Sequence, residues 1–455
     1  MFNRSLGILF CFLFISLNPV WGAIPAKKIE TANGITVLLV ETHSLPMVQV
    51  DLLVRAGSIL DSEPKAGLAY LTASLLEEGT KNRSSKQIAD EWDALGTEFN
   101  ASPGSDYVTF SSKLLKKDLE KGLTLFSDIL INPQFPEEEV SREKTELLGH
   151  LDNEKDDPET IAAKAFDRAI FGKHPYHQPL EGDEETIKRI TREDIVRFYQ
   201  TAYNPRGAIL AFVGDLTEEE AKTYAEKYFR LWNPKPQIHS KNPLPPKIDK
   251  KEIMVIDKDL TQTSIILGHT GIPRMNPDYY SLLVMNYILG GGGFSSRMMT
   301  NIRDNKGLVY GLFSHFDSRL ETGSFEVTLQ TKNSSANEAI SEVLNEIRKM
   351  RNEPVSPVEL QEAKDYLIGS FPLKMDTHAK LAGILIYQEF YGLGLDYFDK
   401  YAQRIKKVTA EEVQRVARQY LDPDRFVLVA IGKQSEAKIG VNQSISIQKE
   451  KTKQP

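Results

Sequence analysis

A glycine run is the first part of this sequence with a composition that could support chemistry. The run and the aromatic residue after it are Gly290, Gly291, Gly292, Gly293 and Phe294. Because glycine has no side chain, such a run lets a ligand approach the backbone closely, so these five residues are candidate substrate-binding residues. A flexible loop with the same composition is the alternative. Ser295 stands where a G-x-G-x-x-G sequence has its third glycine, so a dinucleotide-binding turn is not predicted.

Histidines are the second candidate, and they are scattered. Of the eight, His174 and His177 are closest to each other. A zinc site needs three or four converging ligands, so we predict a structural or surface role for this pair. The sequence contains neither H-E-x-x-H nor H-x-x-E-H, and it lacks the phosphate-binding and serine-nucleophile motifs. The only cysteine, Cys11, lies near the N-terminus, so the rest of the chain has no thiol nucleophile.

The N-terminus resembles a secretory signal. Arg4 precedes the apolar run Leu6–Leu17, and small residues follow it. This pattern predicts a signal peptide at residues 1–23, a periplasmic or secreted protein, and no stable membrane insertion after cleavage. A membrane anchor is the alternative, but a span needs about 20 apolar residues. The net charge of −7 argues against nucleic-acid binding.

The mature chain divides into two halves that look like repeats. A proline-rich linker at 233–250 separates residues 24–232 from residues 251–437, and a polar tail at 438–455, expected to be disordered from Gln443 onward, follows. Three pairs of matching residues lie 218 positions apart: Thr191 and Thr409, Pro205 and Pro423, Gly214 and Gly432. A constant offset over several elements indicates a duplicated domain.

Both halves show the same order of predicted elements. Strand-like runs open each half at 35–40 and 48–54, then 253–256 and 263–267, and close it at 208–214 and 426–432. Helical patterns lie between them at 86–95, 117–130, 137–150, 337–350 and 357–368. Thr191 and Thr409 are expected helix N-caps. The pattern predicts an α+β fold of two duplicated α/β sandwich domains, each a sheet with helices on one face.

The segment Gly67–Thr80 carries a family resemblance that covers nearly the whole mature chain. It resembles the G-[IL]-A-H-x-x-E-H-x-x-x-x-G-T helix of pitrilysin/insulinase-type zinc peptidases, a group that includes the mitochondrial processing peptidases. The frame matches at Gly67, Leu68, Ala69, Gly79 and Thr80. By this resemblance the chain would form half of a clamshell chamber.

The chemical positions of that motif are replaced. The resemblance places Tyr70 and Ser74 where the family has histidine ligands, and Ala73 where it has the general base. Counting back from Asp156-Asp157-Pro158 places His150 at the third ligand position, with Glu143 as a supporting glutamate. One potential ligand makes no zinc site, so we expect no metal or other cofactor in this chain.

The second half keeps another family element. Residues 301–310 resemble the R-x6-Y element, in which an arginine and a tyrosine hold the substrate across the cavity from zinc. Here these residues are Arg303 and Tyr310. A guanidinium can donate to peptide carbonyls, and a phenol can stabilise an oxyanion. Seven residues correspond to about two helical turns, so both side chains are expected on one helical face. Without the family frame, a surface arginine and a core tyrosine would be the favoured interpretation of this pair.

Three hypotheses follow. The first is a catalytically incomplete, secreted subunit that supplies Arg303 and Tyr310 to the zinc site of a homologous H-x-x-E-H partner and acts on peptides, with zinc in the partner. The second is a non-enzymatic peptide-binding scaffold or holdase. The third is a hydrolase with another mechanism, which the missing nucleophile motifs disfavour. The Arg303/Tyr310 pair favours the first hypothesis, since a scaffold has no need of it.

Overall fold

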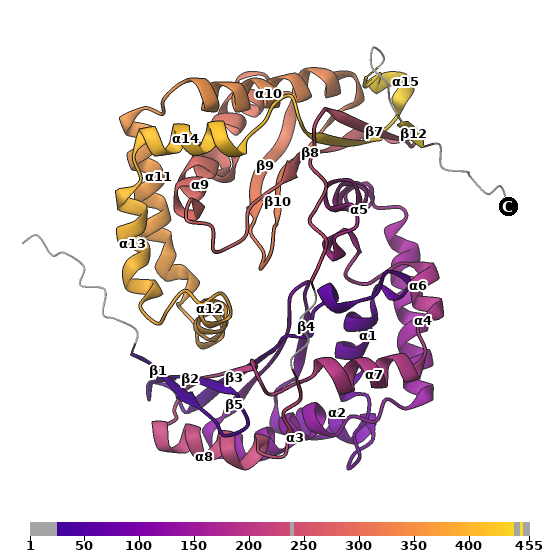
Figure 1. The fold of residues 1–455 in the computed structure, drawn as a ribbon, viewed down its shortest axis with the longest axis vertical. Helices are drawn as coiled ribbons and strands as arrows, with labels where there is room; N and C mark the ends of the chain where they lie inside the picture. The colour runs from indigo at the N-terminus through magenta and orange to yellow at the C-terminus, as the bar shows by residue number, and fades with distance from the viewer. Residues whose placement is uncertain (1–24, 237–240, 441–445, 449–455) are drawn as a thin grey trace, which may run out of the picture.

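Two six-stranded sheets, one in each half of the chain, organise the protein (Figure 1). The computed structural model describes residues 25–236, 241–440 and 446–448, so the predicted signal peptide lies outside the described residues. The first sheet has the order β1-β2-β6-β3-β5-β4 and consists of β1 (Ala26–Glu30), β2 (Thr36–Glu41), β3 (Met47–Val54), β4 (Asn100–Pro103), β5 (Val108–Leu115) and β6 (Ile209–Gly214). The second has the order β12-β7-β11-β8-β10-β9 and consists of β7 (Glu252–Asp257), β8 (Gln262–Thr270), β9 (Val309–Asp317), β10 (Ser324–Lys332), β11 (Val427–Gly432) and β12 (Ser446–Gln448).

The two sheets share one topology. Numbered along the chain, strands β2 to β6 take the same places in the first sheet as β7 to β11 take in the second. In each sheet the closing strand runs parallel to the opening strand, as β6 does to β2 and β11 to β7. The predicted fold class of two similar α/β domains is therefore confirmed.

The C-terminal tail differs from expectation at one place. Residues 446–448, in the segment expected to be disordered, form β12 and pair in parallel with β7. This strand occupies the edge that β1 occupies in the first sheet, where the pairing is antiparallel. Residues 241–250 of the proline-rich linker lie outside helices and strands.

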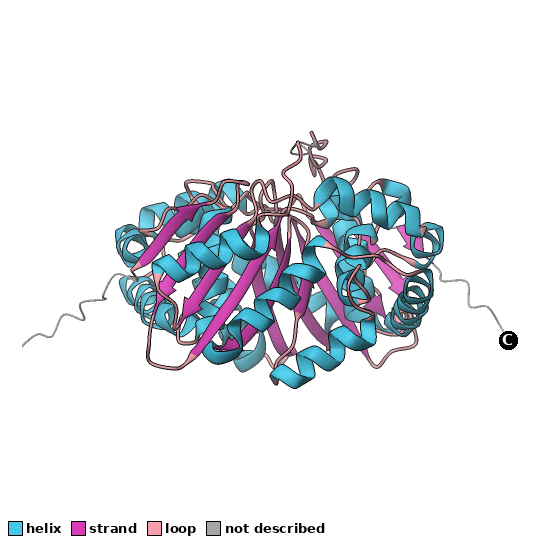
Figure 2. Ribbon diagram, turned by 90° about the horizontal axis from the view of Figure 1, so that it is seen from below, coloured by secondary structure: helices cyan, strands magenta, loops and turns pink. Residues whose placement is uncertain are grey.

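Helices cover the outer face of each sheet, as Figure 2 shows for the first half. The first half contains α1 (Leu68–Ser74), α2 (Ser85–Leu95), α3 (Leu119–Ile131), α4 (Glu137–Glu154), α5 (Pro158–Phe171), α6 (Glu184–Arg189), α7 (Arg192–Ala202) and α8 (Glu218–Phe229). The second contains α9 (Tyr279–Asn286), α10 (Ala336–Asn352), α11 (Pro357–Ser370), α12 (His378–Phe390), α13 (Tyr397–Lys407), α14 (Ala410–Tyr420) and α15 (Gln434–Ala437). Thr191 and Thr409 cap α7 and α14 through capping boxes, as predicted.

The inner face of each sheet is covered by a helix from the opposite half. Helix α5 of the first half packs on β8 and β11, while α12 of the second half packs on β3 and β6 (Figure 1). Phe166 and Ile170 of α5 join one apolar cluster with strands of the second sheet, and Leu385 and Phe390 of α12 join another with strands of the first. The sequence predicts helices on one face of each sheet only, so the helix on the second face differs from that prediction.

Polar contacts also join the halves. His174 is fully buried, and its Nε2 lies 2.7 Å from Glu321 Oε2 in the second half. Its Nδ1 accepts a hydrogen bond from the Tyr176 backbone N–H, so the proton of a neutral ring is on Nε2, facing the carboxylate. Asn242 in the linker donates to the other Glu321 oxygen at 2.8 Å. His174 therefore has the structural role predicted for it.

Within the described residues, no helix has the combined length and apolar character required to cross a bilayer.

Replacing Phe166 with alanine tests how much the helix exchange stabilises the fold. The side chain is fully buried between α5 and the second sheet, so Phe166→Ala should lower the free energy of unfolding by about 3–5 kcal/mol. Phe294→Ala is the matched control, because Phe294 is 68% exposed and its loss should cost roughly 0.5 kcal/mol. Urea denaturation followed by circular dichroism measures both, and equal effects would contradict the prediction.

Candidate functional site

The retained frame of the zinc-helix motif supports the start of α1. Gly67 has a φ of +92°, and a Cβ there would lie 2.6 Å from the Glu181 backbone oxygen, so only glycine fits. The buried Asp61 carboxylate accepts hydrogen bonds from the N–H groups of Gly67 at 3.0 Å and Ala69 at 2.9 Å. Both features act on the fold and need no metal.

The distal part of the frame is structural as well. Thr80 donates its hydroxyl to Asp128 at 2.8 Å and accepts from the N–H groups of Asn82 and Arg83. Gly79 has a φ of +132°, a conformation that a side chain would strain. The matched residues therefore hold the turn after α1 against α3.

The replaced chemical positions lie on one face of α1. Tyr70, Ala73 and Ser74 are spaced i, i+3, i+4, which brings their side chains together. Ala73 is buried, whereas Tyr70 and Ser74 are half-buried. Burial, reinforced by the nearby carboxylates of the 181 loop and α4, raises the pKa of the Tyr70 phenol. The group is therefore a neutral hydrogen-bonding surface.

Within the described residues, no hydrogen bond or ion pair joins His150 to that surface. It lies on α4 with its side chain 60% exposed, and its Nε2 is 3.6 Å from Glu154 Oε1. Two carboxylates near α1 have raised pKa values: burial raises the pKa of Glu77 to about 7, and burial also raises the pKa of Glu143. Sequence reasoning missed Glu77, although it sits one turn beyond the replaced ligands.

The residues present at these positions do not fit zinc. A tyrosine, an alanine and a serine replace the imidazoles and the base, which leaves His150 as the one nitrogen donor of the set. Across residues 25–236, 241–440 and 446–448, no group of three or more His, Cys, Asp or Glu side chains is arranged to hold a metal ion. The arrangement therefore offers no means of activating water in the family manner.

Arg303 and Tyr310 lie together in the second half, but not on one helix as expected. Arg303 belongs to the π-helical segment η8 (Met299–Asn305), and Tyr310 belongs to β9. Gly307, with a φ of +63°, donates its N–H to the Arg303 carbonyl and ends the helix between them. The two side chains meet because the chain turns back, so the expectation of a shared helical face is wrong.

Contacts on three sides fix the Arg303 guanidinium. Its Nε donates to the Tyr310 carbonyl at 2.9 Å, and its Nη1 donates to Asp304 at 2.9 Å. Its central carbon lies 4.8 Å from the centre of the Phe294 ring and 5.8 Å from that of Tyr310. Of the five N–H donors of arginine, three stay free for a ligand. Tyr310 is 89% exposed.

The glycine run fills a tight space behind this pair. A Cβ at Gly290 would lie 2.6 Å from Ser314 Oγ, one at Gly291 would lie 2.5 Å from Asn286 Nδ2, and one at Gly292 would lie 2.6 Å from the Tyr287 carbonyl. Gly293 has open space around it and a φ of +58°. Three of the four glycines are therefore explained by packing, and Phe294, carried by η7 (Gly293–Ser295), projects outward.

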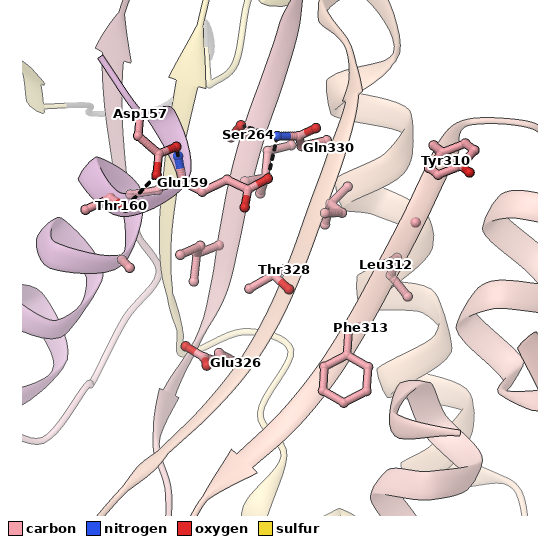
Figure 3. A pocket seen from close by; sticks show the side chains of 16 residues that line it. Asp157, Glu159, Thr160, Ser264, Tyr310, Leu312, Phe313, Glu326, Thr328 and Gln330 are labelled. Carbon is pink, nitrogen blue, oxygen red and sulfur yellow. Dashed lines mark hydrogen bonds between the residues drawn. The ribbon is translucent and has the colours of Figure 1, made fainter. Parts of the chain in front are cut away.

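A cleft of about 600 Å³ opens beside Tyr310 (Figure 3). Its walls are strands β8, β9 and β10 of the second sheet and the first turn of α5 from the first half. Gln330 bridges the two, since its Nε2 donates to Glu159 at 2.6 Å and to Ser264 at 3.3 Å. Tyr310 lies at the end of the cleft farthest from α5 (Figure 3). Tyr70 and His150 belong to the other half and do not line it.

Family models cover most of the chain. Residues 36–184 match the model described as insulinase, peptidase family M16, and residues 189–367 match the model described as peptidase M16 inactive domain. The chain belongs to the M16 peptidase family. This confirms the resemblance seen in the sequence.

Several related proteins are similar to this M16 chain over most of their own length. An uncharacterized zinc protease of Rickettsia bellii is 29% identical over 76% of this chain and 83% of its own. The crystal structure of a peptidase M16 inactive domain from Pseudomonas fluorescens is 29% identical to this chain and superposes with a TM-score of 0.84. The similarity covers 93% of this chain and 99% of that one. A protease from Helicobacter pylori shares the fold, with a TM-score of 0.83 at 22% identity over 89% of this chain and 99% of its own.

Restoring the M16 zinc positions tests whether the frame is otherwise intact. The purified native chain should contain no stoichiometric zinc. The combined substitutions Tyr70→His, Ala73→Glu, Ser74→His and His150→Glu should bind about one zinc per chain, because α1 already presents positions 70, 73 and 74 on one face. Elemental analysis after dialysis measures both.

The same four-residue variant without Ser74→His is the control and should bind zinc more weakly. One zinc per native chain, lost on His150→Ala, would contradict the prediction of a metal-free chain.

Proposed function

We propose that this chain is a catalytically incomplete subunit of a zinc peptidase heterodimer, with a homologous H-x-x-E-H subunit as its partner. One observation carries the proposal: a half-buried Arg303 and an exposed Tyr310 lie together beside a cleft, in a chain whose zinc positions hold no ligand set. Peptide cleavage by this complex would need zinc, and the partner would supply it.

The Arg303/Tyr310 pair has the donors needed to hold a peptide in the transition state. The free N–H groups of Arg303 can donate to a peptide carbonyl, and the Tyr310 hydroxyl can donate to the oxyanion that forms when water attacks. Asp304 and the Phe294 ring restrict the guanidinium before substrate arrives, which reduces the entropy lost on binding. These groups cannot activate water, so hydrolysis depends on the partner.

The proposal also covers the location of the complex in the cell and the chamber in which peptides would be held. The signal-like N-terminal segment supports action in the periplasm or outside the cell. Two chains of this kind, each a pair of similar α/β halves, would enclose a chamber that admits peptides by size. Arg303 and Tyr310 would face the partner's zinc across that chamber.

Tyr310→Phe is the sharpest test, because it removes only the hydroxyl. In the complex reconstituted with the H-x-x-E-H partner, recovered by co-purification from a native extract, kcat on a quenched fluorescent peptide should fall about 10²- to 10³-fold with little change in KM. Arg303→Ala should lower kcat and also raise KM, since the arginine orients the peptide.

Tyr366→Phe is the matched control. This tyrosine is also exposed, its ring packs on Tyr287, and its hydroxyl should be dispensable. Unchanged turnover in Tyr310→Phe and Arg303→Ala, with the complex intact, would overturn the catalytic assignment and favour a non-enzymatic peptide-binding scaffold.

A further inference from the structure

The tip of the β9–β10 hairpin in the second half contacts the first half. The Leu320 backbone N–H donates to Asp106 at 3.0 Å, and the Tyr176 hydroxyl donates to the other oxygen of the same carboxylate. The Arg319 guanidinium lies over the Tyr176 ring at 4.8 Å and over the Phe171 ring at 5.4 Å. The hairpin is thus held by groups from the β4–β5 turn, from α5 and from the segment after it.

More acidic than basic groups meet at this contact. Arg319 forms an ion pair with Asp317 at 2.6 Å within the hairpin itself. Glu326 on β10 lines the cleft together with Thr160 and Ala163 of α5. Asp167 follows Ala163 by four residues and so lies on the same face of α5, and both carboxylates interact with the Asp317–Arg319 ion pair, one from each half. Within the described part of the chain, neither Asp167 nor Glu326 has a hydrogen bond or an ion pair of its own. When Asp167, Asp317 and Glu326 are all ionised, three carboxylates share the one guanidinium of Arg319.

Other groups around the contact complete the charge inventory. His315 is the residue directly opposite Glu326 on β9. The remaining titratable or charged groups that face the contact are Asp106, Glu321, His174, Tyr107, Tyr391 and Arg55. Asp106 and Glu321 are hydrogen-bonded, which leaves Asp167 and Glu326 as the uncompensated pair.

We propose that Asp167 and Glu326 form a proton-controlled latch between the two halves: the hairpin is held tightly when both carboxyls are protonated and is released locally when both ionise. Glu326 also lines the cleft, on the side facing α5 (Figure 3), so its proton exchanges with solvent. The latch therefore couples solution pH to the contact between the hairpin tip and the first half. This inference does not depend on the proposed peptidase function.

The direction of the pH response follows from burial. Burial first, and then the neighbouring carboxylates, raise the pKa of Glu326 to about 7, and burial raises the pKa of Asp167 to about 6. A carboxyl whose pKa is raised in the closed form stabilises that form below its ordinary pKa, and this stabilisation is lost as pH rises through the raised value. The closed latch is accordingly strongest below pH 5 and weakest above pH 7.

Hydrogen exchange of the full chain at pH 5.5 and pH 8.0 tests the latch. After correction for the intrinsic pH dependence of amide exchange, the opening constant of residues 317–326 should rise about ten- to a hundredfold between the two values, as expected if both carboxyls regain ordinary pKa values on opening. Helix α10 should show no such change.

Asp167→Asn and Glu326→Gln keep the size of each side chain and remove its charge. Each should reduce the pH response, and the two together should abolish it with the hairpin protected at pH 8.0. Glu138→Gln, an exposed carboxylate on α4, and His315→Gln are controls that should respond like the native chain. The latch would be overturned if the opening constant of the native chain changed less than twofold, or if the double variant kept the full pH response. Loss of the pH response in His315→Gln alone would also overturn it, and would assign the response to that histidine.

Discussion

The fold depends on each half covering the sheet of the other. Strands β6 and β11 are buried at every residue, so neither sheet could leave its inner face in water without a large loss of hydrophobic free energy. Helices α5 and α12 provide that cover, and each belongs to the opposite half. Because one helix crosses in each direction, the two halves share their cores and cannot separate as independent domains. The cleft beside β10 has a fixed wall in α5 for the same reason.

This mutual cover explains how a zinc motif can lose its chemistry while its frame remains. Gly67 and Thr80 hold α1 and the turn after it, and any replacement there would strain the backbone or break buried hydrogen bonds. The ligand positions have no such structural role, because Ala73 only packs in the interior and the His150 side chain is largely in solvent. Stability therefore constrains the frame and leaves the chemical positions free to change.

Much of the architecture could be predicted from the sequence. The strand-like run at 48–54 became β3, at Met47–Val54, because its apolar residues alternate with Gln49 and Asp51, and a period of two is typical of a strand. The capping residues Thr191 and Thr409 were predictable from local chemistry, and the constant offset between halves revealed the duplication. These features depend on residues close together in the chain.

The remaining features depend on contacts between distant residues. Helical periodicity shows that α5 and α12 have apolar faces, but it does not indicate which sheet covers them. The pairing of Asp167 with Glu326 has no local signature either. For Tyr310 a signal was present and unused: Lys306-Gly307 is a typical helix end, which places the tyrosine beyond the helix and in the strand that follows. The Arg303/Tyr310 pair itself was found through its family motif, and its geometry required the fold.

Strand β9 ends its sheet, and an unpaired strand edge can recruit strands from other molecules and lead to aggregation. In this protein the side chains of Arg303 and Asn286 already occupy the Tyr310 and Ser314 carbonyls along that edge. A foreign strand would have to displace both before it could add to the sheet. The residues that shape the exposed surface at Tyr310 therefore also protect a protein with an open cleft from self-association.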